Sequence, residues 1–438
     1  MASDSPSPRF LLESGTYQID NIGDIAMLQV AVQRIKARWP GSHIDVVTEQ
    51  PERLKRVLPE VEPMPASSWF RQPIVPVPGF AKYWNPTKRL RWWERRVGPK
   101  WPRLANAGKQ WHAKREPDGG LEKSVAFYEA LRQADAVICT GGGFLNDFYH
   151  EHAFKVLTTL QAAQGLGKHT AIFGVGLGPW TRHDLKEIAG PTIRDVDALS
   201  LRDQRLSLDV AREIAVEDRK RFVTGDDAIA LAHAAKDADD CAGGRHGLGV
   251  NVRLSADAEV DRALLPALGK TLQDLAGEHD APLVPLVIRT ADSPINDVES
   301  ARLLLGSGLD LTVAEAVRTP ADAFEQIARC KVVVTGAYHN AVFALSMGIP
   351  VVALATGDYY LAKMNGVADM FGLGMTVLDY RDAKLLPKLR DATQRAWAEA
   401  QNLRVPLRDA ARDQIGKADT AYEALFSSIV AAFESRQS

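Results

Sequence analysis

The segment 331–356 constrains the fold more than any other part of the chain. Its two apolar runs, Val332–Val334 and Val351–Leu354, do not alternate with polar residues, which is typical of parallel strands covered on both faces. A helical stretch that begins near His339 and Asn340 lies between them. Such a helix starts beside the carboxyl end of the first strand, where open α/β sheets bind ligands and helix N-termini favour anions. The segment therefore predicts a phosphorylated ligand beside His339 and Asn340, unless the histidine only caps or fills an ordinary loop.

The same alternation of apolar runs and helical patterns extends over most of the chain. It predicts an α/β fold of two Rossmann-like doubly wound domains that face a cleft, similar to the GT-B fold of glycosyltransferases. A small, polar stretch at 238–249 separates the two series. The strands are expected at 10–12, 44–47, 134–140, 170–175 and 197–201, with a short segment at 222–230, and then at 248–252, 281–288, 309–311, 332–334 and 351–354.

These patterns divide the chain into three regions. We expect an N-terminal α/β domain at 1–240, a C-terminal α/β domain at 245–385 and a helical tail at 386–438 that is broken near Pro406. The glycines 141–143 follow a predicted strand and are interpreted as a tight turn or as a close approach of backbone to a ligand.

Composition excludes several classes of function. The 438 residues, 46% of them apolar, are enough for two domains, and a net charge of −2 gives no positive field for nucleic acid. The three cysteines, Cys139, Cys241 and Cys330, indicate neither a disulfide framework nor a zinc site. No histidine or carboxylate cluster has metal-ligand spacing and no dinucleotide or P-loop fingerprint occurs, so we expect no metal and no cofactor. The chain lacks a signal-peptide pattern and an apolar run of membrane-spanning length, which predicts a cytoplasmic protein.

The segment 82–115 departs from the rest of the chain. It contains eleven Lys or Arg residues and one acidic residue, Glu94, with five tryptophans interleaved. A solvated basic loop whose tryptophans cover the domain would have this composition. A patch for anionic lipid at the inner face of the membrane, or for a lipid-diphosphate-linked acceptor, would have it too, because tryptophan favours the interface and basic residues attract anionic head groups.

Several motifs together resemble the polysaccharide pyruvyl transferase family. Each is short, and their order and spacing make the resemblance specific. The motifs are NIGDIAML at 21–28, GGGFLND at 141–147, GVGLGP at 174–179, SLRDQRLS at 200–207, TGDDAIAL at 224–231, GVNVR at 249–253, AYHNAVFALSMGIPVVAL at 337–354 and YYLAKMNGVADMFGL at 359–373.

The resemblance implies transfer of the pyruvyl group of phosphoenolpyruvate onto two sugar hydroxyls as a cyclic ketal. The C-terminal domain would bind this donor, whose protonation needs a general acid that titrates near neutrality, and His339 is the candidate. The donor's phosphate and carboxylate need cations and amides. The candidates for this role are Arg253, Arg289, Asn340 and Lys363.

The N-terminal domain would hold the acceptor, a cell-surface glycan or its lipid-linked precursor. Carboxylates and amides after the first and third strands suit hydroxyl recognition, and Asp24 is the candidate catalytic base, although it could equally be the N-cap of a helix from Ile25. Arg202 and Asp203 are interpreted as a structural ion pair. The candidate acceptor-binding residues are Asn21, Gly142, Gly143 and Asp147.

One position departs from the family pattern. The family usually carries an arginine two residues before the histidine, where this chain has Ala337. A GT-B glycosyltransferase that uses a nucleotide sugar is therefore the alternative, since such enzymes carry a similar Thr-Gly-x-x-His helix. A glycan-binding protein that has lost catalysis is a third interpretation. The sequence indicates no oligomeric state.

Overall fold

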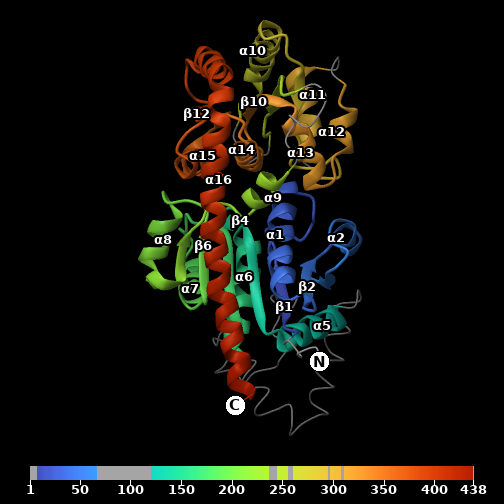
Figure 1. Ribbon diagram of the computed structural model, residues 1–438, viewed down its shortest axis with the longest axis vertical. Helices are drawn as coiled ribbons and strands as arrows, with labels where there is room; N and C mark the ends of the chain where they lie inside the picture. The colour runs from blue at the N-terminus through green and yellow to red at the C-terminus, as the bar shows by residue number, and fades with distance from the viewer. Residues whose placement is uncertain are drawn as a thin grey trace.

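The computed structural model describes residues 7–66, 120–235, 244–254, 260–293, 296–306 and 310–437. These residues form two parallel β-sheets flanked by helices, one above the other in Figure 1. The basic segment 82–115 lies outside the described residues, so its membrane contact stays a prediction. Within the ranges just given, no helix is long and apolar enough to cross a membrane.

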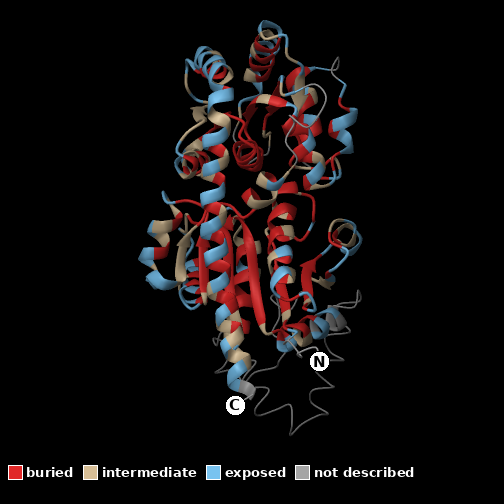
Figure 2. Ribbon diagram, in the orientation of Figure 1, coloured by how far each residue is buried: buried red, intermediate tan, exposed pale blue. Residues whose placement is uncertain are grey.

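The first sheet has seven parallel strands in the order β3-β2-β1-β4-β5-β6-β7. Its central strands are buried on both faces (Figure 2): Phe10 and Leu12 pack in one core with α1, and Leu11 packs in another with α5 and α6. The strands are β1 (Arg9–Glu13), β2 (His43–Thr48), β3 (Glu62–Pro65), β4 (Ala136–Leu145), β5 (His169–Leu177), β6 (Ala198–Leu201) and β7 (Arg221–Val223), and the helices are α1 (Ile22–Arg38), α2 (Pro51–Val57), α5 (Gly120–Gln133), α6 (His150–Gly165), α7 (His183–Arg194), α8 (Ser207–Glu213) and α9 (Ala228–Ala234).

The second sheet has five parallel strands in the order β12-β11-β10-β8-β9. Val332 and Val334 of β10 pack against α10, whereas Val333 packs on the other face with α14, as the apolar run predicted. The strands are β8 (Gly247–Asn251), β9 (Leu283–Pro285), β10 (Cys330–Thr335), β11 (Val351–Ala355) and β12 (Met375–Asp379), and the helices are α10 (Leu265–Glu278), α11 (Asp297–Leu305), α12 (Thr312–Ala316), α13 (Pro320–Ala328), α14 (Tyr338–Ser346), α15 (Gly357–Phe371) and α16 (Leu385–Gln437).

Three local features differ from what the sequence led us to expect. No strand forms at Asp310 and Leu311, because the Asp310 carboxylate accepts hydrogen bonds from the amide (2.9 Å) and hydroxyl (2.6 Å) of Thr312 and so starts α12; Leu309 lies outside the described residues. The glycines 141–143 do not form a turn but continue β4 as far as Leu145. The edge strands β3 and β12 were not predicted, because their half-buried residues lack a strong apolar run.

The C-terminal helix α16 does not break at Pro406, contrary to the prediction. It runs from the second sheet along the first (Figure 1) and packs on both sides of the proline. Leu407 and Ala411 are fully buried, and farther along Tyr422 stacks on Phe173 of β5 with ring centroids 3.7 Å apart. This packing outweighs the lost hydrogen bond and the ring clash, which together cost about 3 kcal/mol in an unsupported helix.

The two domains are joined by backbone hydrogen bonds at the start of α1. The amide of Ile22 donates to the carbonyl of Ile288 (2.9 Å), and the amide of Thr290 donates to the carbonyl of Asp20 (3.2 Å). Arg205 and Asp369 form an ion pair across the same boundary. The residues after the carboxyl ends of both sheets thereby face one another.

Candidate active site

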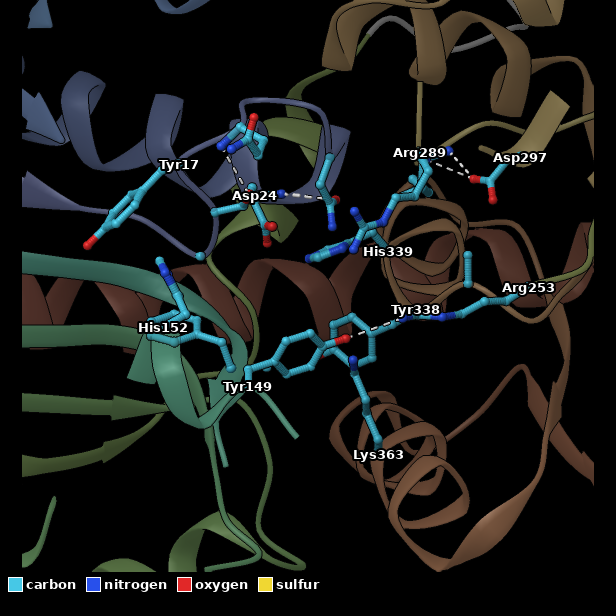
Figure 3. A pocket seen from close by; sticks show the side chains of 18 of the residues that line it. Tyr17, Asp24, Tyr149, His152, Arg253, Arg289, Asp297, Tyr338, His339 and Lys363 are labelled. Carbon is cyan, nitrogen blue, oxygen red and sulfur yellow. Dashed lines mark hydrogen bonds between the residues drawn. The ribbon is translucent and has the colours of Figure 1, made fainter. Parts of the chain in front are cut away.

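A cavity of about 380 Å³ lies between the carboxyl ends of the two sheets, within the size range of small-molecule sites. Both domains contribute to it (Figure 3), and it collects seven of the ten predicted site residues. These seven are Asn21, Asp24, Gly143, Arg253, Arg289, His339 and Lys363.

The other three predicted residues do not line this cavity. The Asp147 carboxylate accepts hydrogen bonds from the amide of Thr181 (2.5 Å), its hydroxyl (2.6 Å) and the amide of Arg182 (3.3 Å), so it organises the loop after β5. Asn340 is completely buried. At Gly142, φ is 142°, and an added Cβ would meet the Phe144 ring at 3.0 Å, so the backbone conformation of β4 requires a glycine at this position.

His339 lies in the first turn of α14 and is nearly buried, with 7% of its surface exposed. One ring nitrogen, Nε2, lies 3.6 Å from Oδ2 of Asp226, whose side chain is 1% exposed. The ring also packs against Gly23 of α1, where an added Cβ would come within 2.0 Å of Cγ and Nδ1. The first domain therefore fixes the position of this imidazole, which belongs to the second domain.

Asp226 was not predicted as a site residue, although its motif, TGDDAIAL, was part of the resemblance. Burial alone would raise the pKa of Asp226, but His339 and Arg202 outweigh burial and lower it, so the carboxylate is ionised. Its second oxygen accepts a hydrogen bond from the amide of Ala228 at 2.9 Å. A fixed negative charge therefore lies behind the imidazole.

Asp24 is not a helix cap, because α1 begins three residues earlier than the sequence suggested. The cap is Asn21, whose side-chain oxygen accepts hydrogen bonds from the amides of Gly23 (3.0 Å) and Asp24 (3.4 Å). Burial raises the pKa of Asp24, and the positive charges of His339 and Arg289 offset this only in part. A carboxyl group with a raised pKa that lines a cavity suits proton transfer.

Arg202 forms no ion pair with Asp203 among the described residues, contrary to the prediction. The Asp203 carboxylate instead accepts hydrogen bonds from Leu206 and Ser207 at the start of α8. Arg202 is 4% exposed, its Cζ lies 4.4 Å from the ring centroid of Tyr338, and its Nη1 has no hydrogen-bond partner within the described part of the chain. A buried guanidinium with an unpaired nitrogen at a cavity is suited to an anion.

The glycine at the end of β4 permits the cations to approach. A Cβ at Gly143 would lie 2.5 Å from Nη2 of Arg202 and 3.2 Å from Nζ of Lys363. Arg253 follows β8 and donates to the Tyr149 hydroxyl at 3.4 Å, and Arg289 lies 3.7 Å from Asp20. Together with Lys155, five cations from both domains line a cavity to which position 337 contributes none.

The wall formed by the first domain contains residues that the sequence did not single out. The Tyr17 hydroxyl donates to Oε2 of Glu13 (2.7 Å), and burial raises the pKa of Glu13 to about 7 despite this hydrogen bond. The His152 ring lies edge-on between Tyr17 and Phe144, each with centroids 4.7 Å apart, and its Nε2 lies 2.8 Å from the carbonyl oxygen of Ser14. Burial lowers the pKa of His152 to about 4, so at neutral pH Nε2–H donates to that carbonyl and Nδ1 is an acceptor.

Comparison with solved structures defines the class of fold. The chain is similar to the UDP-GlcNAc 2-epimerase from Neisseria meningitidis bound to UDP-GlcNAc (TM-score 0.51, 11% identity, covering 96% of this chain and 100% of that chain). It is also similar to S. aureus MnaA with UDP (TM-score 0.52, 12% identity, 93% and 94% covered) and to Arabidopsis thaliana UGT89C1 complexed with quercetin (TM-score 0.50, 11% identity, 97% and 99% covered). At these identities the likeness shows the fold alone, and it confirms the predicted GT-B-like arrangement of two Rossmann-like domains.

The sequence then identifies the family within this class. The profile of the polysaccharide pyruvyl transferase family matches residues 21–359, which is most of the chain. The chain belongs to this family, as the motifs predicted, and it is a transferase. No curated protein sequence matches it.

Proposed function

We propose that the protein transfers the pyruvyl group of phosphoenolpyruvate to two hydroxyls of a cell-surface glycan or its precursor. The observation that carries this proposal is the cavity itself, where a proton-transfer pair, His339 and Asp24, lies among five cations. Phosphoenolpyruvate has a phosphate and a carboxylate, which cations from both sides can bind. The donor is the only cosubstrate that the proposal requires.

The cations divide by domain. Arg253, Arg289 and Lys363 come from the second domain, and Arg202 and Lys155 line the same cavity from the first. We assign the three residues of the second domain and Arg202 to donor binding. Arg202 and Lys363 both lie over the Tyr338 ring, beside Ala337, and so supply positive charge near the position where the family usually has arginine.

The reaction balances with a single proton donor and a single proton acceptor. His339 protonates the methylene carbon of the donor, which gives an oxocarbenium-like centre at the carbon that bears the phosphate. One acceptor hydroxyl attacks this centre, the second displaces the phosphate, and two C–O bonds replace the enol double bond and the C–O bond to phosphate. One hydroxyl proton passes to the enzyme, with Asp24 as the candidate base, and restores His339; the other leaves with inorganic phosphate.

The wall of the first domain suits a sugar. Phe144, Tyr17 and His152 line the cavity on this side, with their rings edge to face. Sugars bind through stacking on aromatic rings together with directed hydrogen bonds, so we assign this wall, with Asn21 and Gly143, to the acceptor. A lipid-linked saccharide at the cytoplasmic face of the membrane is the form of acceptor that we propose, and segment 82–115 is the proposed membrane contact.

Phosphate release tests this function. Purified protein should release inorganic phosphate from phosphoenolpyruvate only when a glycan acceptor is present, and the acceptor should gain one ketal. Conversion of a nucleotide sugar without use of phosphoenolpyruvate would overturn the proposal.

A GT-B glycosyltransferase is the second candidate, and Ala337 favours it because the family arginine is missing there. Such an enzyme should be stabilised by a nucleoside diphosphate, by about 2.7 kcal/mol at a hundred times its Kd. No shift in melting temperature at millimolar UDP or GDP would rule against it.

A further inference from the structure

The contact between the buried side chains of His339 and Asp226 has no role in the mechanism proposed above. Nε2 of His339 and Oδ2 of Asp226 lie 3.6 Å apart, and neither has a hydrogen-bond partner among the described residues. A buried polar atom without a partner is costly, and each of these two atoms faces the other. A small rotation of either side chain would bring them to hydrogen-bond distance.

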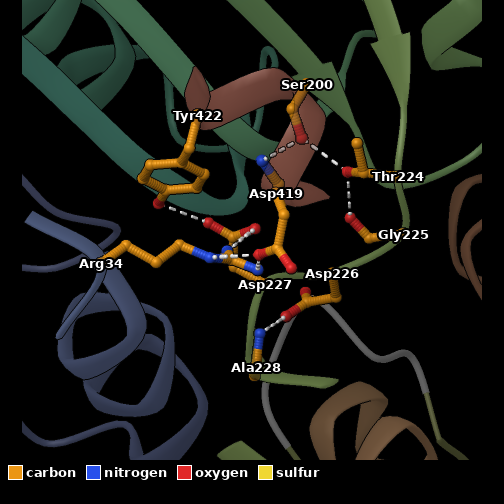
Figure 4. A network of polar contacts seen from close by, with 10 residues as sticks. Arg34, Ser200, Thr224, Gly225, Asp226, Asp227, Ala228, Asp419 and Tyr422 are labelled. Atoms are coloured by element: carbon orange, nitrogen blue, oxygen red, sulfur yellow. Dashed lines mark hydrogen bonds and ion pairs between the residues drawn. The ribbon is translucent and has the colours of Figure 1, made fainter. Parts of the chain in front are cut away.

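The loop that carries Asp226 is held rigidly (Figure 4). The neighbouring Asp227 accepts hydrogen bonds from Nη1 of Arg34 on α1 (3.3 Å) and from the Tyr422 hydroxyl on α16 (2.7 Å). Arg34 also lies over the Tyr422 ring, 4.6 Å from its centroid. The long helix and the first helix therefore fix the position of the carboxylate behind His339.

The pair also crosses the domain boundary. Asp226 follows β7 of the first sheet, whereas His339 starts α14 in the second domain. We propose that Asp226 is the positioning residue for His339: it fixes the tautomer with the proton on Nε2, stabilises the charged ring, and leaves Nδ1 as the nitrogen that exchanges a proton with the ligand. A carboxylate with this placement behind a catalytic histidine orients the ring and is not itself protonated. Because the partners belong to different domains, the histidine is fully oriented only when the domains are docked as they are here.

The catalytic part of this inference rests on the proposed function, and its first test is kinetic. Asp226→Asn keeps the shape but loses the charge, and it should lower kcat about 10²–10⁴-fold with the Michaelis constant for phosphoenolpyruvate changed less than threefold. Asp226→Glu should restore part of the rate. The double variant Asp226→Asn/His339→Ala should be no slower than His339→Ala alone, since Asp226 acts through the histidine. Additive losses, or wild-type kcat in a folded Asp226→Asn protein, would overturn the inference.

A matched control exists elsewhere in the chain. Asp45 pairs with His43, with Nε2 and Oδ1 3.1 Å apart, and neither residue lines the cavity. Asp45→Asn removes the same charge from another histidine–aspartate pair and should leave kcat unchanged. An equal loss in this control would show that the effect of Asp226→Asn is general and would contradict a positioning role.

A second test does not need turnover. In ¹⁵N-histidine spectra of the full chain, with the signal of His339 assigned from His339→Ala, the neutral ring should carry its proton on Nε2 in the wild type. In Asp226→Asn the population of this tautomer should fall. An unchanged tautomer would contradict the inference even if phosphoenolpyruvate proves not to be the donor, whereas failure of phosphate release with the expected tautomer would overturn only the proposed function.

Discussion

Gly23→Ala should move the catalytic histidine without removing any functional group. A Cβ at this position would lie 2.0 Å from Cγ and Nδ1 of His339, whereas ordinary contacts begin at 3.4 Å, so the ring must shift by about 1.4 Å (3.4 − 2.0). A displacement of about 1 Å at a reacting group can cost 10²-fold in rate. We therefore expect kcat to fall at least 100-fold in acceptor-dependent phosphate release.

A measurement of the free energy of unfolding distinguishes this steric effect from a loss of folded protein. Overpacking costs about 1–3 kcal/mol, while alanine gains up to about 1 kcal/mol over glycine inside a helix, so Gly23→Ala should remain folded with a net loss of about 0–3 kcal/mol. Gly416→Ala in α16 is the matched control, because a Cβ there meets nothing within 4 Å; it should be slightly stabilised and fully active. Wild-type turnover in a folded Gly23→Ala protein would refute the placement of His339 against α1.

Three further predictions concern the walls of the cavity and its support. Glu13→Gln should gain stability relative to the wild type as pH rises, because the pKa of Glu13 is raised from 4.5 to about 7 in the folded state and the wild type loses about 3 kcal/mol (2.5 × 1.36) of stability across this window. Urea unfolding at pH 4.5 and pH 8 measures the difference in stability, and a difference that does not change with pH would contradict the prediction. Arg202→Met should raise the Michaelis constant for phosphoenolpyruvate about 10–100-fold, because a charged hydrogen bond contributes about 1.5–3 kcal/mol. Arg205→Met removes an arginine from an exposed ion pair and should change this Michaelis constant less than twofold; equal effects of the two substitutions would remove Arg202 from the donor site. Tyr422→Phe should destabilise the protein by about 1–3 kcal/mol in urea unfolding, because the buried Asp227 carboxylate loses a hydrogen-bond donor. An unchanged unfolding midpoint would show that the hydrogen bond from Arg34 is enough for this carboxylate.

Local patterns were enough to predict two parallel sheets, but not their edge strands β3 and β12. The apolar runs at β10 and β11 and the helix between them follow from residues adjacent in sequence, and so does the position of His339 at the start of α14. The order of the family motifs placed Asp24 and Lys363 on the same cavity, although they are far apart in the chain.

The remaining site residues depend on contacts that no local pattern contains. Asp226 and Arg202 each lie next to a second charged residue, Asp227 and Asp203 respectively, and the sequence cannot show which member of each pair belongs to the site. Tertiary contacts decide it, because the Asp203 carboxylate accepts the amide hydrogens of Leu206 and Ser207 at the start of α8, and Asp227 accepts a hydrogen bond from the Tyr422 hydroxyl. The continuous helix through Pro406 has the same origin, since the packing that supports it comes from strands distant in sequence.

The central claim is that His339 delivers a proton to the methylene carbon of phosphoenolpyruvate, and the reaction in D₂O tests it most directly. The wild-type enzyme should form a pyruvyl ketal whose methyl group carries one deuteron, seen by NMR and as a mass increase of one unit, because an exchangeable proton on the enzyme becomes a methyl hydrogen. His339→Ala should form this product at least 100 times more slowly. A ketal without deuterium in its methyl group, or an unchanged rate in His339→Ala, would contradict the account.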